Sequence, residues 1–99
     1  MNHRLIIRKR AETHIEDAYD WYEQRKKDLG SDFLQAIEEA FKIIELNPLA
    51  FQFKYKTIRA IYTKRFPYGI FYTIDKNKII VLAVFHLSQN PKLWHKLSE

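Results

Sequence analysis

The chain has no cysteine, and its 99 residues include only two glycines and three prolines. Without cysteine it can form neither a disulfide framework nor a thiolate metal site, and nothing indicates an oxidising compartment. Because so few residues interrupt regular structure, we expect no long linkers, and because no period of about 20–50 residues repeats, we expect no repeat array. The longest apolar run, Ile79 to Phe85, is far shorter than the roughly 18 residues of a membrane span. We therefore expect one cytoplasmic domain, residues 1–99, with no membrane association.

Charge is distributed unevenly along the chain, although the formal net charge is +5. Residues 1–47 contain eight basic and ten acidic residues, whereas residues 48–99 contain nine basic and two acidic residues. A basic half attracts phosphates or carboxylates and accelerates their encounter with the protein. The asymmetry favours an anionic partner, which could be a nucleic acid or an acidic protein segment.

The beginning of the chain has the pattern of a short strand followed by an amphipathic helix. Leu5–Arg8 is an apolar run typical of a first strand. From Ala11 to Leu29 the apolar residues recur with helical spacing, and Glu23 and Lys27 form a favourable pair on the opposite face. Gly30 follows the last periodic residue, which is the position of a helix-ending glycine.

A second amphipathic helix follows directly. Ser31 or Asp32 can cap its start, because both side chains accept hydrogen bonds from the first turn of a helix. Asn47-Pro48 ends it, since proline cannot continue the helical hydrogen bonds. Two helices in series with a short connection predict an antiparallel hairpin.

The second half of the chain has the pattern of three consecutive antiparallel strands. Ile58–Phe66 and Tyr68–Ile74 are rich in alternating β-branched and aromatic residues. Ile79–Phe85 has no polar face, so it should be a strand covered on both sides. Pro91 is expected to open a short C-terminal helix over Lys92–Leu97. The sequence thus predicts an α+β fold of order β-α-α-β-β-β, with a helical hairpin on an antiparallel sheet and a short C-terminal helix.

Basic residues gather in the strand region, where no acidic residue occurs between Glu45 and Asp75. They are Lys54, Lys56, Arg59, Lys64 and Arg65. Strand alternation would place Arg59 and Arg65 on one face, where together they could hold a phosphate or a carboxylate. Histidine titrates near neutral pH, so His86 is a candidate general acid or base. The other histidines lack metal-ligand spacing and there is no phosphate-binding loop, so we expect no metal and no cofactor.

Three stretches, taken in order, resemble toxins of the RelE/ParE superfamily of bacterial type II toxin–antitoxin systems. They are Asp17–Glu23, the Arg-Phe-Pro-Tyr turn and strand of Arg65–Tyr72, and Val81–His86 with Pro91 and Trp94 after it. The resemblance spans the chain. It implies a cognate antitoxin as partner, binding through an acidic and apolar segment to give a toxin–antitoxin hetero-oligomer.

The superfamily contains two kinds of toxin. RelE-like members cut mRNA on the ribosome without a metal, and the resemblance would assign that catalysis to His86, Arg65, Lys54 and Lys56. ParE-like members block DNA gyrase and cleave nothing. Here Gly69 stands where ribonuclease members tend to have arginine, Leu87 and Gln89 stand where related sequences often have arginines, and a late tyrosine is absent. These departures favour the ParE-like branch.

Three functions therefore stay open: a ParE-like growth-inhibiting toxin, a RelE-like ribosome-dependent endoribonuclease, and a degenerate member without toxicity. The ParE-like function is the leading hypothesis. The residues predicted to bind the target or the antitoxin are Arg59, Lys64, Arg65, Tyr68, Tyr72, Trp94 and Lys96.

Overall fold

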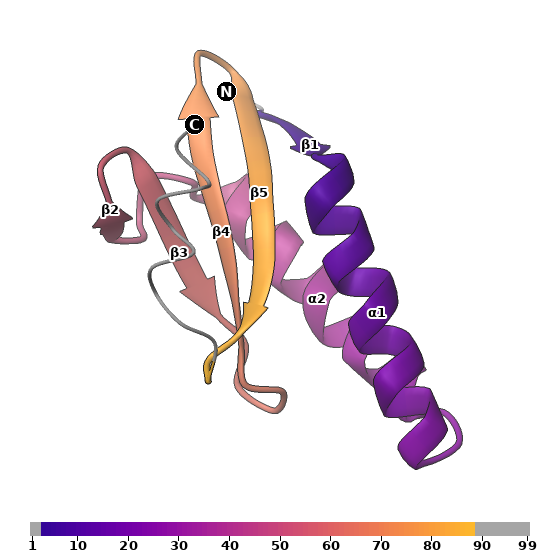
Figure 1. The fold of residues 1–99 in the computed structure, drawn as a ribbon. Coiled ribbons are helices and arrows are strands. Elements are labelled where there is room, and N and C mark those ends of the chain that lie inside the picture. Colours follow the sequence, from indigo (N-terminus) through magenta and orange to yellow (C-terminus); the bar gives the residue numbers. More distant parts are fainter. Residues whose placement is uncertain (1–2, 89–99) are drawn as a thin grey trace.

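A computed structural model describes residues 3–88 of the protein (Figure 1). The elements in chain order are β1 (Arg4–Ile7), α1 (Lys9–Arg25), α2 (Leu29–Leu46), β2 (Phe53–Tyr55), β3 (Ile58–Tyr62), β4 (Tyr68–Asp75) and β5 (Lys78–His86). The predicted C-terminal helix lies outside the described residues, as do Trp94 and Lys96. The α+β class and the strand, two helices and strands order are confirmed.

The five strands form one sheet in the order β1-β5-β4-β3-β2. Strands β3, β4 and β5 are antiparallel neighbours, as the alternating pattern predicted. Strand β1 instead pairs in parallel with β5, with Arg4 opposite Lys78, so the sheet is mixed and not antiparallel throughout. The three-residue β2 pairs with the start of β3 and was not predicted as a separate strand.

Helices α1 and α2 form the predicted hairpin and cover one face of the sheet (Figure 1). The core lies between the helices and the sheet. It is built from the apolar rows of both helices and from the strand side chains that face the helices. Its largest fully buried members are Tyr72, Phe33, Ile37, Ile44, Ile70, Ile79 and Val81. Burial of this apolar surface is the main stabilising contribution to the fold.

The connection between the helices differs from the prediction. Helix α1 ends at Arg25, and Gly30 lies inside the first turn of α2, so it does not end α1. An added Cβ at Gly30 would lie 2.8 Å from the backbone oxygen of Tyr19, so this glycine allows the two helices to approach closely. Glu23 does not face outward toward Lys27. Its carboxylate accepts hydrogen bonds from the backbone N–H groups of Asp28 and Gly30, both at 3.0 Å, and thereby caps α2 in place of Ser31 or Asp32.

The opposite face of the sheet has a second buried cluster. Its members are Ile58, Ala60, Phe71, Leu82, Ala83 and Phe85. Leu82 is the extra residue of a β-bulge, because Phe71 pairs with Ala83 while Tyr72 pairs with Val81. Strand β5 is thus covered on both sides, as its continuous apolar sequence predicted. Among residues 3–88, no helix has the length and apolar character needed to cross a membrane.

Candidate functional site

Arg59, a predicted binding residue, is engaged within the fold. Its Nη1 atom donates hydrogen bonds to the carbonyl oxygens of Phe51 at 2.6 Å and Leu49 at 3.3 Å. Its guanidinium carbon also lies 3.9 Å from the centroid of the Phe53 ring. A guanidinium has several donors in one plane, so it can hold two carbonyl groups of one loop together. Arg59 therefore fixes the loop that follows α2 against β3.

Arg65 and Arg59 contact opposite ends of α2. The chain leaves β3 after Tyr62, so the strand alternation expected to align the two arginines ends before Arg65. The Nη2 atom of Arg65 lies 3.3 Å from Oδ2 of Asp32, in the first turn of α2, whereas Arg59 contacts the loop beyond the last turn. The structure does not bring the two guanidinium groups to a common anion.

The two predicted tyrosines both point to the helix side of the sheet. Tyr72 is completely buried, and its hydroxyl donates a hydrogen bond to the carbonyl of Pro48 at 2.6 Å. Burial raises the pKa of Tyr72 to about 12, against the opposing effect of Arg59. Burial, followed by the neighbouring Tyr22, also raises the pKa of Tyr68 to about 12. Both hydroxyls therefore stay protonated at neutral pH, and Tyr72 is out of reach of a partner.

Lys54 and Lys56 lie on the β2–β3 hairpin at the edge of the sheet. The Nζ atom of Lys54 is 5.3 Å from the ring centroid of Tyr62, whose ring in turn packs against Phe71 of the second cluster. Lys56 occupies the hairpin turn with φ 50° and lies over the ring of Tyr55. The two lysines are exposed, but they belong to the edge and to the face opposite the helices.

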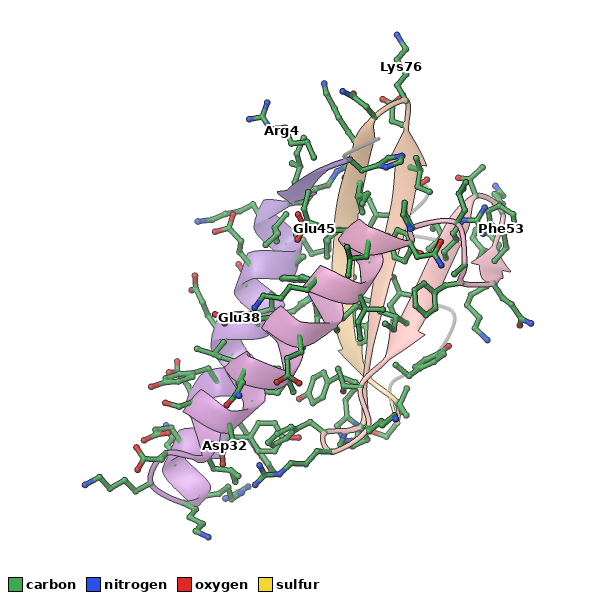
Figure 2. The ribbon with its side chains drawn as sticks, turned by 180° about the vertical axis from the view of Figure 1, so that it is seen from behind. Arg4, Asp32, Glu38, Glu45, Phe53 and Lys76 are labelled. Atoms are coloured by element: carbon green, nitrogen blue, oxygen red, sulfur yellow. The ribbon has the colours of Figure 1, made fainter. Side chains whose placement is uncertain are left out.

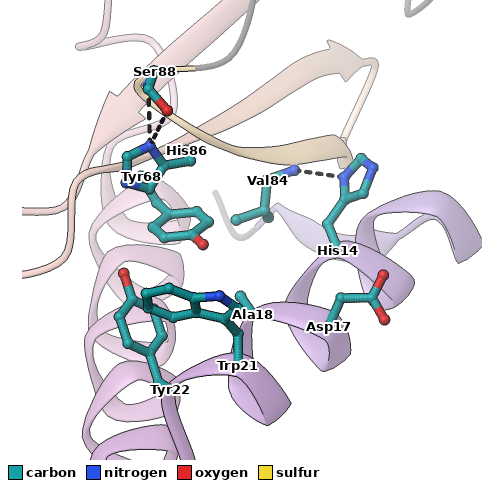
Figure 3. Close-up of a pocket in the computed structure, with 9 residues that line it drawn as sticks. All are labelled: His14, Asp17, Ala18, Trp21, Tyr22, Tyr68, Val84, His86 and Ser88. Carbon is teal, nitrogen blue, oxygen red and sulfur yellow. Dashed lines mark hydrogen bonds between the residues drawn. The ribbon is translucent and has the colours of Figure 1, made fainter. Parts of the chain in front are cut away.

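His86 lies on the helix side of the sheet, in a hollow of about 410 Å³ that we call the α1 pocket (Figure 3). The pocket lies between α1 and the ends of β4 and β5, and its residues are His14, Asp17, Ala18, Trp21, Tyr22, Tyr68, Val84, His86 and Ser88. Nδ1 of His86 accepts the backbone N–H of Ser88 at 3.0 Å and lies 2.7 Å from its hydroxyl oxygen. The ring of His86 also packs edge-on against Tyr68.

The four residues assigned to catalysis by the resemblance therefore lie in three places. His86 is in the α1 pocket, Arg65 is paired with Asp32 at the start of α2, and the two lysines are on the edge hairpin. General acid–base chemistry requires its groups within hydrogen-bonding reach of one reacting atom. The described residues do not assemble such a site. They also contain no cluster of three or more histidines and carboxylates suited to a metal.

His14 has a structural contact that the sequence did not indicate. Its Nδ1 accepts the backbone N–H of Val84 at 3.2 Å (Figure 3), and its ring packs 4.9 Å from that of Phe85. Burial, followed by the charge of Arg10, lowers the pKa of His14, with Asp17 acting in the opposite direction. The acceptor role requires an unprotonated nitrogen, so the hydrogen bond and the lowered pKa agree.

Lys64 and Arg65 line a second hollow of about 660 Å³, which we call the α2 groove. It runs between α2 and the end of β3, and its residues are Asp32, Gln35, Ala36, Glu39, Ala40, Ile43, Phe51, Ile61, Tyr62, Thr63, Lys64 and Arg65. Figure 2 shows the course of α2 from Asp32 to Glu45, with Phe53 at the nearby edge of the sheet. Of the predicted binding residues that are described, Lys64 and Arg65 are the ones with exposed side chains.

The residues that α2 contributes to this groove were not predicted from the sequence. Ala36, Ala40 and Ile43 share one helix face, for which the sequence pattern made no prediction. Ile43 is 49% exposed. The available signal was the pair of small residues four apart next to an isoleucine, which leaves a hollow where larger side chains would have filled the interface.

Comparison with known proteins agrees with this fold. The family model described as "ParE toxin of type II toxin-antitoxin system, parDE" matches residues 5–91. A chain of the chromosomal ParDE TA system from P. aeruginosa is 18% identical, with a TM-score of 0.72 over 87% of this chain and 97% of that one. A chain of the toxin–antitoxin complex RelBE2 from Mycobacterium tuberculosis is 15% identical, with a TM-score of 0.58 over 87% of this chain and 99% of that one. No curated protein matches the sequence.

Proposed function

The chain belongs to the ParE toxin family of type II toxin–antitoxin systems, and from this membership we propose that it arrests bacterial growth by binding DNA gyrase. The membership confirms the resemblance seen in the sequence, including its ParE-like side. In this proposal the protein acts by occupying its target and not by cutting RNA. A cognate antitoxin holds it inactive in the cytoplasm as a hetero-oligomer.

The separation of the candidate catalytic residues is the observation that carries this proposal. A metal-independent ribonuclease must place cationic groups and a proton acceptor around one phosphate. Here the cationic side chain of Lys54 packs on Tyr62, which contacts the second cluster, while His86 lies in the α1 pocket on the other side of the sheet. Side chains on opposite faces of a sheet cannot act on one phosphate, which favours a binding mechanism.

The antitoxin is the partner that the surface chemistry supports. The second half of the chain has a charge balance of +7, and apolar side chains are exposed at Ile43, Leu46, Leu49 and Phe53. A segment that combines acidic and apolar residues would satisfy both features when it folds onto the toxin. The two solved structures described above come from toxin–antitoxin systems.

The first experiment is to induce the chain alone in a bacterial host and follow the incorporation of labelled thymidine and methionine within minutes. We expect thymidine incorporation to fall first, and purified protein to inhibit supercoiling by gyrase. The variant K54A/K56A should remain toxic, because neither lysine serves catalysis in this proposal. An early fall in methionine incorporation that this variant abolishes would establish the ribonuclease instead. No change in either label would indicate a non-toxic member.

A further inference from the structure

The α1 pocket is built on one stripe of α1 that is open to solvent. The helix contributes five residues at helical spacing, which are His14, Asp17, Ala18, Trp21 and Tyr22. Ala18 is 6% exposed, and its small side chain leaves a hollow between α1 and Val84 of β5. A larger apolar side chain at this position would fill that space. The proposed function uses none of these residues.

Three aromatic rings form one side of the pocket. Trp21 packs edge-on against Tyr22, with 5.0 Å between the ring centroids, and Tyr22 packs edge-on against Tyr68 at 6.2 Å. Figure 3 shows these rings on one side of Ala18 and the carboxylate of Asp17 on the other. Trp21 is 51% exposed although it belongs to this cluster. A large aromatic surface left in contact with water beside a hollow is typical of a binding site.

The charge of the pocket is negative. Asp17 is exposed and forms no ion pair within residues 3–88, and the described lining residues include neither lysine nor arginine. The Nδ1 atoms of His14 and His86 each accept a backbone N–H. An imidazolium has a proton on both nitrogens and cannot accept a hydrogen bond, so neither histidine is cationic in this arrangement. The pocket is therefore anionic in a protein whose net charge is +5.

The surface of α1 beside the pocket has the same sign. Glu12, Glu16 and Asp20 are exposed, lie four residues apart, and form no ion pair in the described part of the chain. Like charges at this spacing repel each other, so a cation nearby is stabilised. An acidic antitoxin segment would be repelled from this side of the molecule. The α1 pocket therefore suits a cationic group of a different partner.

A guanidinium group matches both the rings and the carboxylate. It is planar, so its face stacks on an aromatic ring while its edge donates two parallel hydrogen bonds to a carboxylate. The protein already contains the first of these contacts, because the guanidinium carbon of Arg25 lies 4.1 Å from the centroid of Trp21, over one face of that ring. Asp17 and Trp21 are four residues apart on α1, which places their Cβ atoms about 5–6 Å from each other. One guanidinium group can therefore contact both side chains.

We propose that the α1 pocket binds the guanidinium group of an arginine side chain that belongs to the protein inhibited by this toxin. The group stacks on Trp21 and donates hydrogen bonds to Asp17, and its alkyl stem lies over Ala18. The inference rests on the proposed function, because it takes the target to be a protein. It adds the chemistry of one contact with that target, on a surface separate from the α2 groove.

A small ligand tests the chemistry of the site. N-acetyl-arginine amide is titrated into the purified full-length toxin in a calorimeter, and we expect a Kd of about 1 mM or lower for a ligand of this size. N-acetyl-citrulline amide has nearly the same shape without the charge, and it should bind roughly tenfold more weakly. Equal affinity for the two ligands, or no binding of the arginine ligand, would overturn the proposal.

Matched substitutions test whether the ligand lies in the pocket. Asp17→Asn removes the charge and Trp21→Ala removes the ring, and each should raise the Kd of the arginine ligand by about fivefold or more. Asp20→Asn removes the same charge from an exposed neighbour that does not line the pocket, and it should change Kd by about twofold at most. Circular dichroism checks that the variants are folded. Native affinity in Asp17→Asn would mean that the ligand binds elsewhere, and it would overturn the site.

Inhibition of gyrase supercoiling tests the source of the arginine. Asp17→Asn should raise the toxin concentration needed for half inhibition by about fivefold or more, whereas Asp20→Asn should leave it unchanged. The affinity of Asp17→Asn for the antitoxin should equal that of the native chain. Unchanged inhibition by Asp17→Asn, or a loss of antitoxin affinity, would overturn the assignment to the target. A native chain that binds the arginine ligand through Asp17 but does not inhibit gyrase would refute the proposed function and leave the guanidinium site standing.

Discussion

Removal of one hydroxyl group, by Tyr72→Phe, tests the contact that joins the sheet to the loop after α2. The Tyr72 hydroxyl donates to the carbonyl of Pro48 at 2.6 Å, and both residues are buried. The substitution keeps the ring that packs between the helices and the sheet. It leaves the Pro48 carbonyl without its donor in a place where water does not reach it.

The expected loss of unfolding free energy is about 1–3 kcal/mol, the usual cost of leaving a buried polar group unsatisfied. For a chain of 99 residues this corresponds to a fall in Tm of at least about 4 °C. The loop that begins at Pro48 also carries Phe51, which lines the α2 groove.

Thermal unfolding followed by circular dichroism measures the stability effect. Tyr62→Phe is the matched control, because Tyr62 is 40% exposed and keeps its ring over Lys54 after the change. It should change stability by no more than about 0.5 kcal/mol. A Tm of Tyr72→Phe equal to that of the control would refute the reasoning, since the buried hydrogen bond would then contribute nothing.

Three further substitutions test local features of the fold. Gly30→Ala should destabilise by about 1–3 kcal/mol, because its methyl group would meet the backbone oxygen of Tyr19 at 2.8 Å; a higher Tm would show that the helices can separate freely. Glu23→Gln should cost about 1–2 kcal/mol in urea unfolding, because the carboxylate caps two N–H groups of α2; an unchanged midpoint would exclude the cap. His14 has a lowered pKa, so the folded protein binds this proton less readily than the unfolded chain, and stability should fall as the pH decreases below the unfolded value of 6.5 toward the folded one. His14→Gln can still accept the N–H of Val84 without titrating, so melts at about pH 7.5 and about pH 5.5 should show a smaller loss than in the native protein; equal losses would contradict the assignment.

Elements with strong periodicity could be predicted from the sequence. The apolar rows of the two helices and the alternating strands from Ile58 and Tyr68 identify structure because burial on one face imposes a period. The uniformly apolar Ile79–Phe85 correctly indicated a strand covered on both sides. The direction of β1 relative to its neighbour could not be predicted. This strand pairs with one at the far end of the chain, and its four residues contain no sign of parallel pairing.

Features that depend on a tertiary neighbour could not be predicted. Gly30 has the sequence context of a helix-ending glycine, yet its role comes from the proximity of Tyr19. Glu23 has the spacing of a surface ion pair with Lys27, yet it caps the next helix. Arg59 was predicted to bind an anion because it is basic, yet its guanidinium donates hydrogen bonds to the carbonyls of Leu49 and Phe51.

The residues of the candidate site could likewise be predicted only in part from the sequence. Lys64 and Arg65 could be named from charge alone, because an exposed turn between strands leaves cations in solvent. The groove beside them depends on how far α2 lies from β3, which no local pattern encodes.

The parallel pairing of β1 with β5 has a consequence for the synthesis of the protein. Arg4 finds its partner only when Lys78 has been made, and at about 5–20 residues per second this takes roughly 4–15 s. Helix α2 ends at Leu46, so the helical hairpin is made before β3, β4 and β5, which cover its apolar face. A chain that stops before β5 never acquires the strand next to β1, so interrupted translation products lack the complete sheet. Under the proposed function, only the finished chain should therefore be toxic, because only it contains the complete sheet.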